Sequence, residues 1–304
     1  MKQNDNAPDR LSIPGALRQI VKAIQNMDGK CYNSTYYPHN DITNLLKAYS
    51  IHKTQLDPGD RAKCNYCESK IEHAATLQVE HFRPKAKIES GENDHIELPG
   101  YYWLGLEWTN LLLACPKCNG KDAKGNKFPI RGVRANAHNP VEIINQNYTL
   151  NRNQCFANSN PLLLEIPILI NPEIDNPEDY LTFNELGYMM GHGPDADRGE
   201  TSKNIYKLNR DELLACRQDV WNNFKNAINV EIGGHQAGFL DLEGLKFRFR
   251  SISNEIIKRK LPSEEYTLWG RYINNNLNNF LSELDDNYRE IFYEIYIESL
   301  NQIP

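Results

Sequence analysis

Residues 111–119 read LLLACPKCN, and this stretch decides the fold together with CNYC at residues 64–67. Each of the two contains a Cys-x-x-Cys pair, and cysteines at that spacing can reach one tetrahedral Zn²⁺ with bonds of about 2.3 Å. Two such pairs complete a closed site with four sulfur ligands. We therefore predict a structural Zn²⁺ site, whose ligands are Cys64, Cys67, Cys115 and Cys118.

The gap between the two pairs is far longer than the ~15–20 residues of a compact zinc ribbon, so a folded segment must lie between them. It contains VEHFRPK at residues 79–85, and WTN at residues 108–110 just before the apolar run 111–114. We expect a strand over residues 76–81 that ends on Glu80 and His81, and a second, buried strand over the apolar run. Residues 118–121 are expected to open a short helix.

The order Glu-His, then Asn-Leu, then Cys-x-x-Cys-Asn resembles the HNH endonucleases of the ββα-metal type, over roughly residues 61–130. The resemblance implies that His81 is the general base that takes a proton from the attacking water. It implies that Glu80 and Asn119 hold a catalytic Mg²⁺ or Mn²⁺, and that Asn110 braces the loop through backbone hydrogen bonds. Taken singly, His81 reads as a surface histidine, Asn110 as a turn residue and Asn119 as a local cap. Their common order favours the catalytic interpretation.

The chemistry of phosphodiester hydrolysis agrees with these roles. It needs an activated water, for which a neutral imidazole is suited, and a cation that stabilises charge on the phosphoryl oxygens. Four thiolates leave Zn²⁺ no open position, so a separate ion must do the chemistry. Asp122 stands where many HNH sequences have a lysine, which leaves each lysine contact open. Basic residues gather around the motif and are candidates for contact with nucleic-acid phosphates, although a charge run is usually a solvated face: Arg83, Lys85, Lys87, Lys121, Lys124 and Lys127.

Charge is unevenly distributed along the 304 residues, whose formal net charge is −6. Residues 61–134 hold twelve basic and nine acidic residues, a net +3, which leaves −9 for the rest of the chain. This pattern favours a local phosphate contact over wholesale coating by nucleic acid. The odd count of seven cysteines, four of them paired, points to a reducing compartment. Because there is no signal-peptide pattern and no apolar run of ~18 residues, we expect a cytoplasmic protein that does not contact a membrane.

The expected fold class is α+β, with a small ββα-metal HNH module and its four-cysteine zinc site embedded in a mostly helical protein. Residues 1–60 are predicted to form an N-terminal helical arm with helices near 13–27 and 42–49, and residues 61–134 the HNH nuclease module. Residues 135–200 read as a loop-rich connector, and residues 201–304 as a C-terminal helical region. Its helices are expected to begin at Asn209 (a capping box with Glu212), after Pro262, and at Tyr288.

Longer strings resemble a narrower family, the HNH subunit of the Septu anti-phage systems, which also occurs beside some retrons. They are EHFRPK (80–85), LLACPKCN (112–119), KGNKFP (124–129), LINPEIDNPED (169–179) and YKLNR (206–210). The resemblance implies an SMC/ABC-like ATPase as partner. The chain itself has no Gly-x-x-x-x-Gly-Lys-Ser/Thr loop, so ATP dependence would come from outside. The C-terminal helices could serve as a docking surface or a homodimer interface, but core packing explains the same residues.

Three functions are therefore open at the level of sequence. The first is a metal-dependent effector nuclease of a defence complex. The second is a non-catalytic zinc module that binds nucleic acid or a protein partner, and the third is a stand-alone, restriction-type HNH nuclease. Both DNA and RNA, such as tRNA, remain candidate substrates, because a site that reads phosphates does not read bases.

Overall fold

The computed structural model describes residues 7–33, 35–90, 96–135, 141–144 and 147–302. The chain forms two compact units. Unit 1 comprises Met1–Leu181 and Gly191–Leu208, and unit 2 comprises Thr182–Met190 and Asn209–Pro304. In the described ranges, no helix combines the length and the apolar character that a membrane span requires.

The N-terminal arm of unit 1 contains the two helices predicted for it. Helix α1 (Pro14–Asn26) begins at a proline, which suits the first helical position because the amide hydrogen there has no partner within the helix. Its buried face consists of Ala16, Ile20, Ala23 and Ile24, at helical spacing. The short 3₁₀ helix η3 (Gly29–Cys31) follows, and α2 (Asn40–Ser50) packs against strand β4 (Leu111–Ala114), which forms a hairpin with β1 (Gln78–His81).

A two-stranded antiparallel sheet forms the centre of unit 1. Strand β1 (Gln78–His81) pairs with β4 (Leu111–Ala114), with Gln78 opposite Ala114 and His81 opposite Leu111. All four residues of β4 are buried, as expected for a continuous apolar run. The two predicted strands are thus confirmed, although the first begins two residues later than expected.

The helix predicted to open at residues 118–121 is displaced. Helix α3 (Pro116–Asn119) starts between the two cysteines of the second pair and ends on Asn119. Pro116 favours the start because it needs no amide partner. Gly120 leaves the helix in an extended conformation, and a Cβ atom there would approach the carbonyl oxygen of Pro116 to 2.8 Å. Asn119 is therefore the last residue of the helix and not its beginning.

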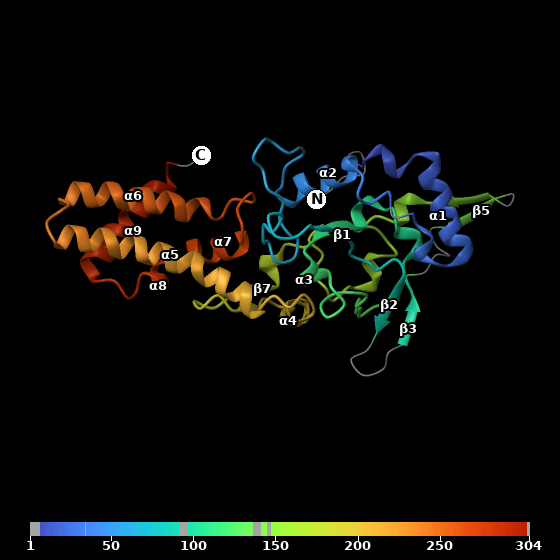
Figure 1. The fold of residues 1–304 in the computed structure, drawn as a ribbon. Helices are drawn as coiled ribbons and strands as arrows, with labels where there is room; N and C mark the ends of the chain where they lie inside the picture. Colours follow the sequence, from blue (N-terminus) through green and yellow to red (C-terminus); the bar gives the residue numbers. More distant parts are fainter. Residues whose placement is uncertain (1–6, 34, 91–95, 136–140, 145–146, 303–304) are drawn as a thin grey trace. The chain divides into compact units, whose positions relative to one another are not determined.

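The rest of unit 1 combines short hairpins with turns and 3₁₀ helices (Figure 1). Three further two-stranded sheets are described, and the boundary between the units runs through the last of them. Helix α4 (Ala196–Ile205) belongs to unit 1 and begins before the predicted end of the connector at residue 200. The strands are β2 (Lys87–Ser90) with β3 (Ile96–Pro99), β5 (Val141–Ile144) with β6 (Asn147–Leu150), and β7 (Leu181–Phe183) with β8 (Met189–Gly191).

Unit 2 is built around the long helices α5 (Asp211–Gln236), α6 (Leu242–Lys258) and α9 (Asp286–Leu300; Figure 1). Helix α6 packs against both α5 and α9, and the short helices α7 (Thr267–Asn275) and α8 (Leu277–Phe280) complete the unit. The rings of Phe249 and Phe292 meet in its core, with centroids 4.9 Å apart.

Two sequence predictions for unit 2 need correction, and one helix was missed. Asn209 does not cap α5, because its side chain bonds the backbone nitrogen and oxygen of Met189 at 2.9 and 2.8 Å, and the helix begins at Asp211. The helix expected directly after Pro262 begins at Thr267 and is interrupted at Asn276. Helix α6 was not predicted. The closing helix, expected from Tyr288, is confirmed as α9.

Candidate functional site

The four paired cysteines form one buried cluster. The backbone nitrogen of Asn65 donates to the carbonyl oxygen of Leu113, and the Asn65 side-chain oxygen accepts from the Leu113 nitrogen, both at 2.8 Å. This pair of bonds ties the first Cys-x-x-Cys turn to β4, which leads directly into the second pair. The four Sγ atoms lie within 4.8 Å of one another, and Cys67 and Cys115 are 3.8 Å apart. Sulfurs around tetrahedral Zn²⁺ with 2.3 Å bonds are separated by about 3.8 Å, so the cluster fits zinc.

The thiols of this cluster are electrostatically unequal. Hydrogen bonds from neighbouring thiols, with that from Cys115 the strongest, hold the pKa of Cys67 well below its usual value. Burial raises the pKa of Cys64. Zinc requires thiolates, so metal binding would release the protons that the buried thiols retain.

Glu80 projects from β1 into the interior of unit 1 and is paired with a lysine. Burial raises the pKa of its carboxyl group, and the charge of Lys124 opposes that shift. Lys124 forms an ion pair with Glu80 Oε1 and donates to the carbonyl oxygen of His81 at 3.0 Å. Because Lys124 is itself fully buried, its charge serves the interior of the site and not its surface.

Asn119 lies on the same side of β1 as Glu80. Its Nδ2 donates to the Gln78 side-chain oxygen at 3.0 Å, and residues 78 and 80 share a face of the strand because side chains alternate. The amide nitrogen is thus occupied, and Oδ1 is the atom of Asn119 that can serve a cation. One carboxylate and one amide oxygen are the donor types that Mg²⁺ prefers when substrate and water complete its shell. Glu80 and Asn119 thus supply donor types that suit a divalent ion, and Lys124 is paired with one oxygen of the carboxylate.

His81 points to the opposite face of β1 and has a fixed hydrogen-bond partner. Its Nε2 lies 2.9 Å from the carbonyl oxygen of Gly105. A carbonyl only accepts, so Nε2 carries the hydrogen and Nδ1 keeps the lone pair. Burial, reinforced by the positive charge of Lys85, lowers the pKa of His81 to about 3. The imidazole is therefore neutral near pH 7.

Asn110 holds the chain immediately after His81. Its Oδ1 accepts from the backbone nitrogen of Arg83 at 2.8 Å, and its Nδ2 donates to the carbonyl oxygens of Arg83 (3.1 Å) and Leu104 (3.3 Å). These bonds join the segment after β1 to the segment that carries Gly105. Asn110 thus makes backbone hydrogen bonds of the kind expected for it, while its part in catalysis stays a prediction.

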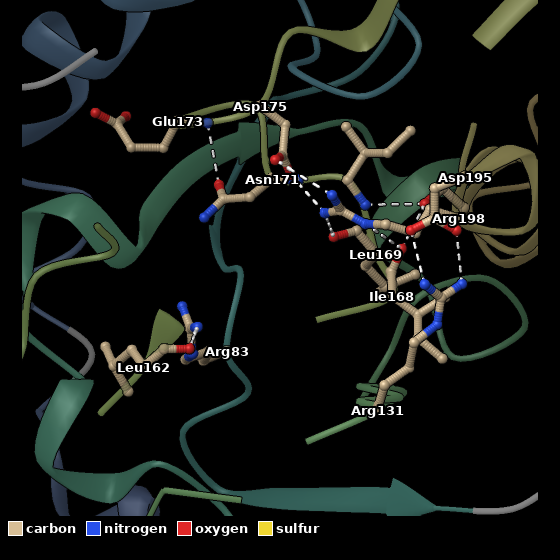
Figure 2. Close-up of polar contacts among 12 residues, drawn as sticks. Arg83, Arg131, Leu162, Ile168, Leu169, Asn171, Glu173, Asp175, Asp195 and Arg198 are labelled. Atoms are coloured by element: carbon tan, nitrogen blue, oxygen red, sulfur yellow. Dashed lines mark hydrogen bonds and ion pairs between the residues drawn. The ribbon is translucent and has the colours of Figure 1, made fainter. Parts of the chain in front are cut away.

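The predicted phosphate contacts separate into two groups. Arg83 is buried and donates to Glu165 (2.8 Å) and to the carbonyl oxygen of Leu162 (2.9 Å; Figure 2). The predicted phosphate contacts of Arg83 and Lys124 do not fit this structure, because both side chains are committed to buried ion pairs. The other basic residues keep accessible surface: Lys121 is exposed, and Lys85, Lys87 and Lys127 are half-buried. Burial lowers the pKa of Lys85 to about 8.

Tyr37 and Gly105 are part of the site but were not identified from the sequence. The rings of Tyr37 and His81 pack edge to face, with centroids 5.0 Å apart and planes at 88°. The nearest signal in the sequence is the aromatic run YNSTYY at residues 32–37, which is equally typical of a packing segment. Gly105 carries no motif. A Cβ atom there would lie 2.2 Å from the ring of Tyr32, so only glycine fits.

The string LINPEID has a structural explanation in unit 1. Figure 2 shows Arg198 of α4 reaching the carbonyl oxygen of Leu169 (3.2 Å) and the carboxylate of Asp175 (2.7 Å). Within the same loop, the backbone nitrogen of Glu173 donates to the side chain of Asn171 at 3.0 Å (Figure 2). These contacts hold residues 168–175 against α4. The structure therefore gives this string a part in the fold and not in a reaction.

Comparison with known proteins places the chain close to Septu proteins. It is 32% identical to Septu protein PtuB of Bacillus mycoides (strain KBAB4) over 184 residues, which are 60% of this chain and 52% of PtuB. It is 29% identical to Septu protein PtuA of the same strain over 164 residues, which are 54% of this chain and 20% of PtuA. The matched parts thus span about half of PtuB and a fifth of PtuA. No family model and no solved structure matches the chain. The similarity supports the Septu-like relationship predicted from the sequence.

Proposed function

We propose that this chain is a metal-dependent endonuclease of the HNH type and the nuclease component of an anti-phage defence system. The observation that carries the proposal is the state of His81. Its Nε2 lies 2.9 Å from the carbonyl oxygen of Gly105, so the hydrogen is on Nε2 and the lone pair of Nδ1 is left to accept a proton from water. Glu80 and Asn119 lie on the other face of the same strand, and the similarity to Septu proteins supports the defence role.

The residues of the chain divide the work of phosphodiester hydrolysis among them. Nδ1 of His81 takes the proton of the attacking water, and Asn110 and Gly105 keep the imidazole in the required tautomer and orientation. Lys85, half-buried and close to His81, supplies a positive charge to a non-bridging phosphate oxygen. A divalent ion on Glu80 and Asn119 would stabilise the negative charge that develops on the phosphoryl and leaving oxygens. The cysteine cluster holds β4 and α3 in a fixed position relative to each other.

A second candidate function is favoured by one observation. Glu80 and Lys124 neutralise each other in the interior, as a purely structural ion pair would. A zinc module that binds nucleic acid or a partner without cutting would need no more than this. The two functions differ in what they require of His81, because only the nuclease needs its basic nitrogen.

The test is a cleavage assay with matched histidine variants. The chain is purified with a co-expressed SMC/ABC-like ATPase and incubated with plasmid DNA or total tRNA, in Mg²⁺, in Mn²⁺ or in EDTA. His81→Ala should lower the cleavage rate by about 10²–10⁴-fold, the usual contribution of a general base. His73→Ala is the control, because His73 is an exposed histidine of the same segment.

The outcomes separate the candidate functions. Metal-dependent cutting that is lost in His81→Ala and kept in His73→Ala supports the nuclease, and the substrate that is cut decides between DNA and RNA. Full cutting by His81→Ala would overturn the assigned base. Nucleic-acid binding without cutting, with zinc content intact, would support the zinc-module function. Cutting by the chain alone, with no co-purifying ATPase, would instead indicate the stand-alone nuclease.

A further inference from the structure

Tyr37 links the N-terminal arm to two functional groups of the proposed active site. Its hydroxyl lies 3.0 Å from the carbonyl oxygen of Gly105 and 2.9 Å from Nζ of Lys85. Its ring and that of His81 meet edge to face, and Lys85 Nζ lies 4.2 Å from the centroid of the Tyr37 ring. One side chain thus contacts the proposed base, the carbonyl that fixes its tautomer, and the ammonium next to it.

The hydrogen atoms in this network have a single consistent assignment. Burial raises the pKa of Tyr37, so its hydroxyl stays protonated. The carbonyl of Gly105 has two lone pairs, which accept the Tyr37 hydroxyl and the Nε2 hydrogen of His81. Lys85 can only donate, so it donates to the Tyr37 oxygen. Tyr37 therefore accepts from Lys85 and donates to Gly105, which also accepts from His81, so the three hydrogen bonds form one connected chain.

The backbone of the arm is held close to this network. A Cβ atom on Gly29 would lie 2.0 Å from the carbonyl oxygen of Lys85, and one on Gly100 would lie 2.5 Å from the carbonyl carbon of the same residue. The segment at Lys85 is therefore enclosed by two glycines, one of them in the arm. The backbone at Lys85 is thus packed directly against the backbone of the arm.

We propose that Tyr37 is a positioning residue of the nuclease site. Its ring fixes the orientation of His81, and its hydroxyl holds the ammonium of Lys85 where that group meets a phosphate of the nucleic acid. This inference rests on the proposed nuclease function. It makes the arm a working part of the site instead of a packing platform beside it.

The two parts of Tyr37 can be separated by substitution. Tyr37→Phe keeps the ring and removes the hydroxyl. Binding of nucleic acid through Lys85 therefore weakens, while His81 stays in place. We expect KM to rise about tenfold, the loss of one charge-assisted hydrogen bond, with kcat within about twofold. Tyr37→Ala also releases the ring of His81, and kcat should fall about 10²-fold because a small misplacement of a catalytic group costs that much.

The neighbouring tyrosine provides a matched control. Tyr36 is buried, and its ring lies beneath the guanidinium of Arg10, outside the network around His81. Tyr36→Phe removes a hydroxyl one residue away and should leave kcat and KM within about twofold of the wild type. Lys85→Met should raise KM as Tyr37→Phe does. The double variant should be no worse than either single variant, because both remove the same contact.

Nitrogen NMR of histidine-labelled protein gives a readout that does not depend on cleavage. The wild type and Tyr37→Phe should show His81 as a single tautomer with its hydrogen on Nε2. Tyr37→Ala should show averaged signals, because the freed ring rotates and water competes for the carbonyl of Gly105. If the wild type does not cut nucleic acid, the proposed function fails and this spectrum still decides the role of Tyr37. Cutting by both Tyr37 variants at the rate of Tyr36→Phe, or unchanged His81 signals in Tyr37→Ala, would overturn the inference.

Discussion

Glu165 provides the sharpest test of how the chain after His81 is held in place. Its carboxylate has no exposed surface and accepts from Arg83 Nε (2.8 Å), from the backbone nitrogen of Ala135 (2.9 Å) and from the hydroxyl of Tyr101. Glu165→Gln keeps the shape of the side chain and removes its charge. The guanidinium of Arg83, which is 1% exposed, would then be buried without a counter-ion.

The expected cost follows from this burial. Removing one partner of a buried ion pair destabilises a protein by about 3–5 kcal/mol. For a unit of this size, each kcal/mol lowers Tm by about 2–4 °C, so the decrease should be about 6–20 °C. Thermal release of zinc is a suitable assay, because the cysteine cluster lies in the same unit as Glu165.

An exposed ion pair of unit 1 is the control. Arg131 and Asp195 form two hydrogen bonds of 2.7 Å, but their side chains are 39% and 33% exposed. Asp195→Asn should therefore cost at most about 1 kcal/mol. If Glu165→Gln is no more destabilising than Asp195→Asn, the reasoning from burial is refuted. The double variant Arg83→Met with Glu165→Leu should recover much of the loss, since no unpaired charge remains.

Three further predictions concern the metal, a buried lysine and the core of unit 2. Cys118→Ser should lose zinc and unfold the hairpin, because structural zinc contributes folding free energy. Metal analysis measures the zinc content and circular dichroism the folding, and a stable, zinc-loaded variant would contradict the four-sulfur site. The pKa of Lys85 in the folded chain is about 8, below its usual 10.5. Between pH 8 and 10.5 the unfolded chain therefore binds more protons than the folded chain, so the stability of the fold should rise with pH in this range. Denaturant titrations at pH 7 to 10.5 should show that Lys85→Met lacks this rise. If stability changes equally with pH in both proteins, Lys85 is not its cause. Phe249→Ala should lower the free energy of chemical unfolding by about 3–5 kcal/mol, because the ring is fully buried against Phe292. Phe247 lies at a 67% exposed position of the same helix, so Phe247→Ala should change that free energy by at most about 0.5 kcal/mol.

The local parts of the site could be predicted from the sequence. The cysteine spacing predicts a cluster because the ligands of one ion must converge, and the structure brings the four sulfurs together. The two strands of the hairpin follow from a short alternating run and a short apolar run, which are signals that a few neighbouring residues carry. Their pairing places Glu80 and His81 at the end of β1, whereas Asn119 contacts Gln78 at the start of the same strand.

The state of individual charges could not be predicted in the same way. Lys124 belongs to a run of lysines that is typical of a solvated surface, yet it is fully buried on Glu80. Arg83 likewise finds its partner in Glu165, far along the chain. Both outcomes depend on tertiary packing. The residues around a charged side chain in the sequence do not indicate which distant group neutralises it.

Helix α6 was missed for a different reason. Residues 246–250 read KFRFR, an alternation of charged and aromatic residues that is typical of a strand. The structure buries Leu245, Phe249, Ser253 and Ile256 at helical spacing and leaves Phe247 exposed. The long-range packing of α6 on α5 and α9 overrides the local alternation.

The close approach of Gly29 and Gly100 to the backbone at Lys85 limits how this protein could be taken apart or recombined. The motif-bearing segment, residues 61–134, looks in the sequence like a cassette that could be transplanted into another scaffold. In the structure it is not self-contained, since the side chain next to its histidine and one of the two glycines around its lysine come from the arm. A graft of the cassette would carry the zinc ligands but leave that histidine without its aromatic neighbour. The smallest portable piece therefore includes the arm, and recombination between related chains should preserve arm and cassette from the same parent.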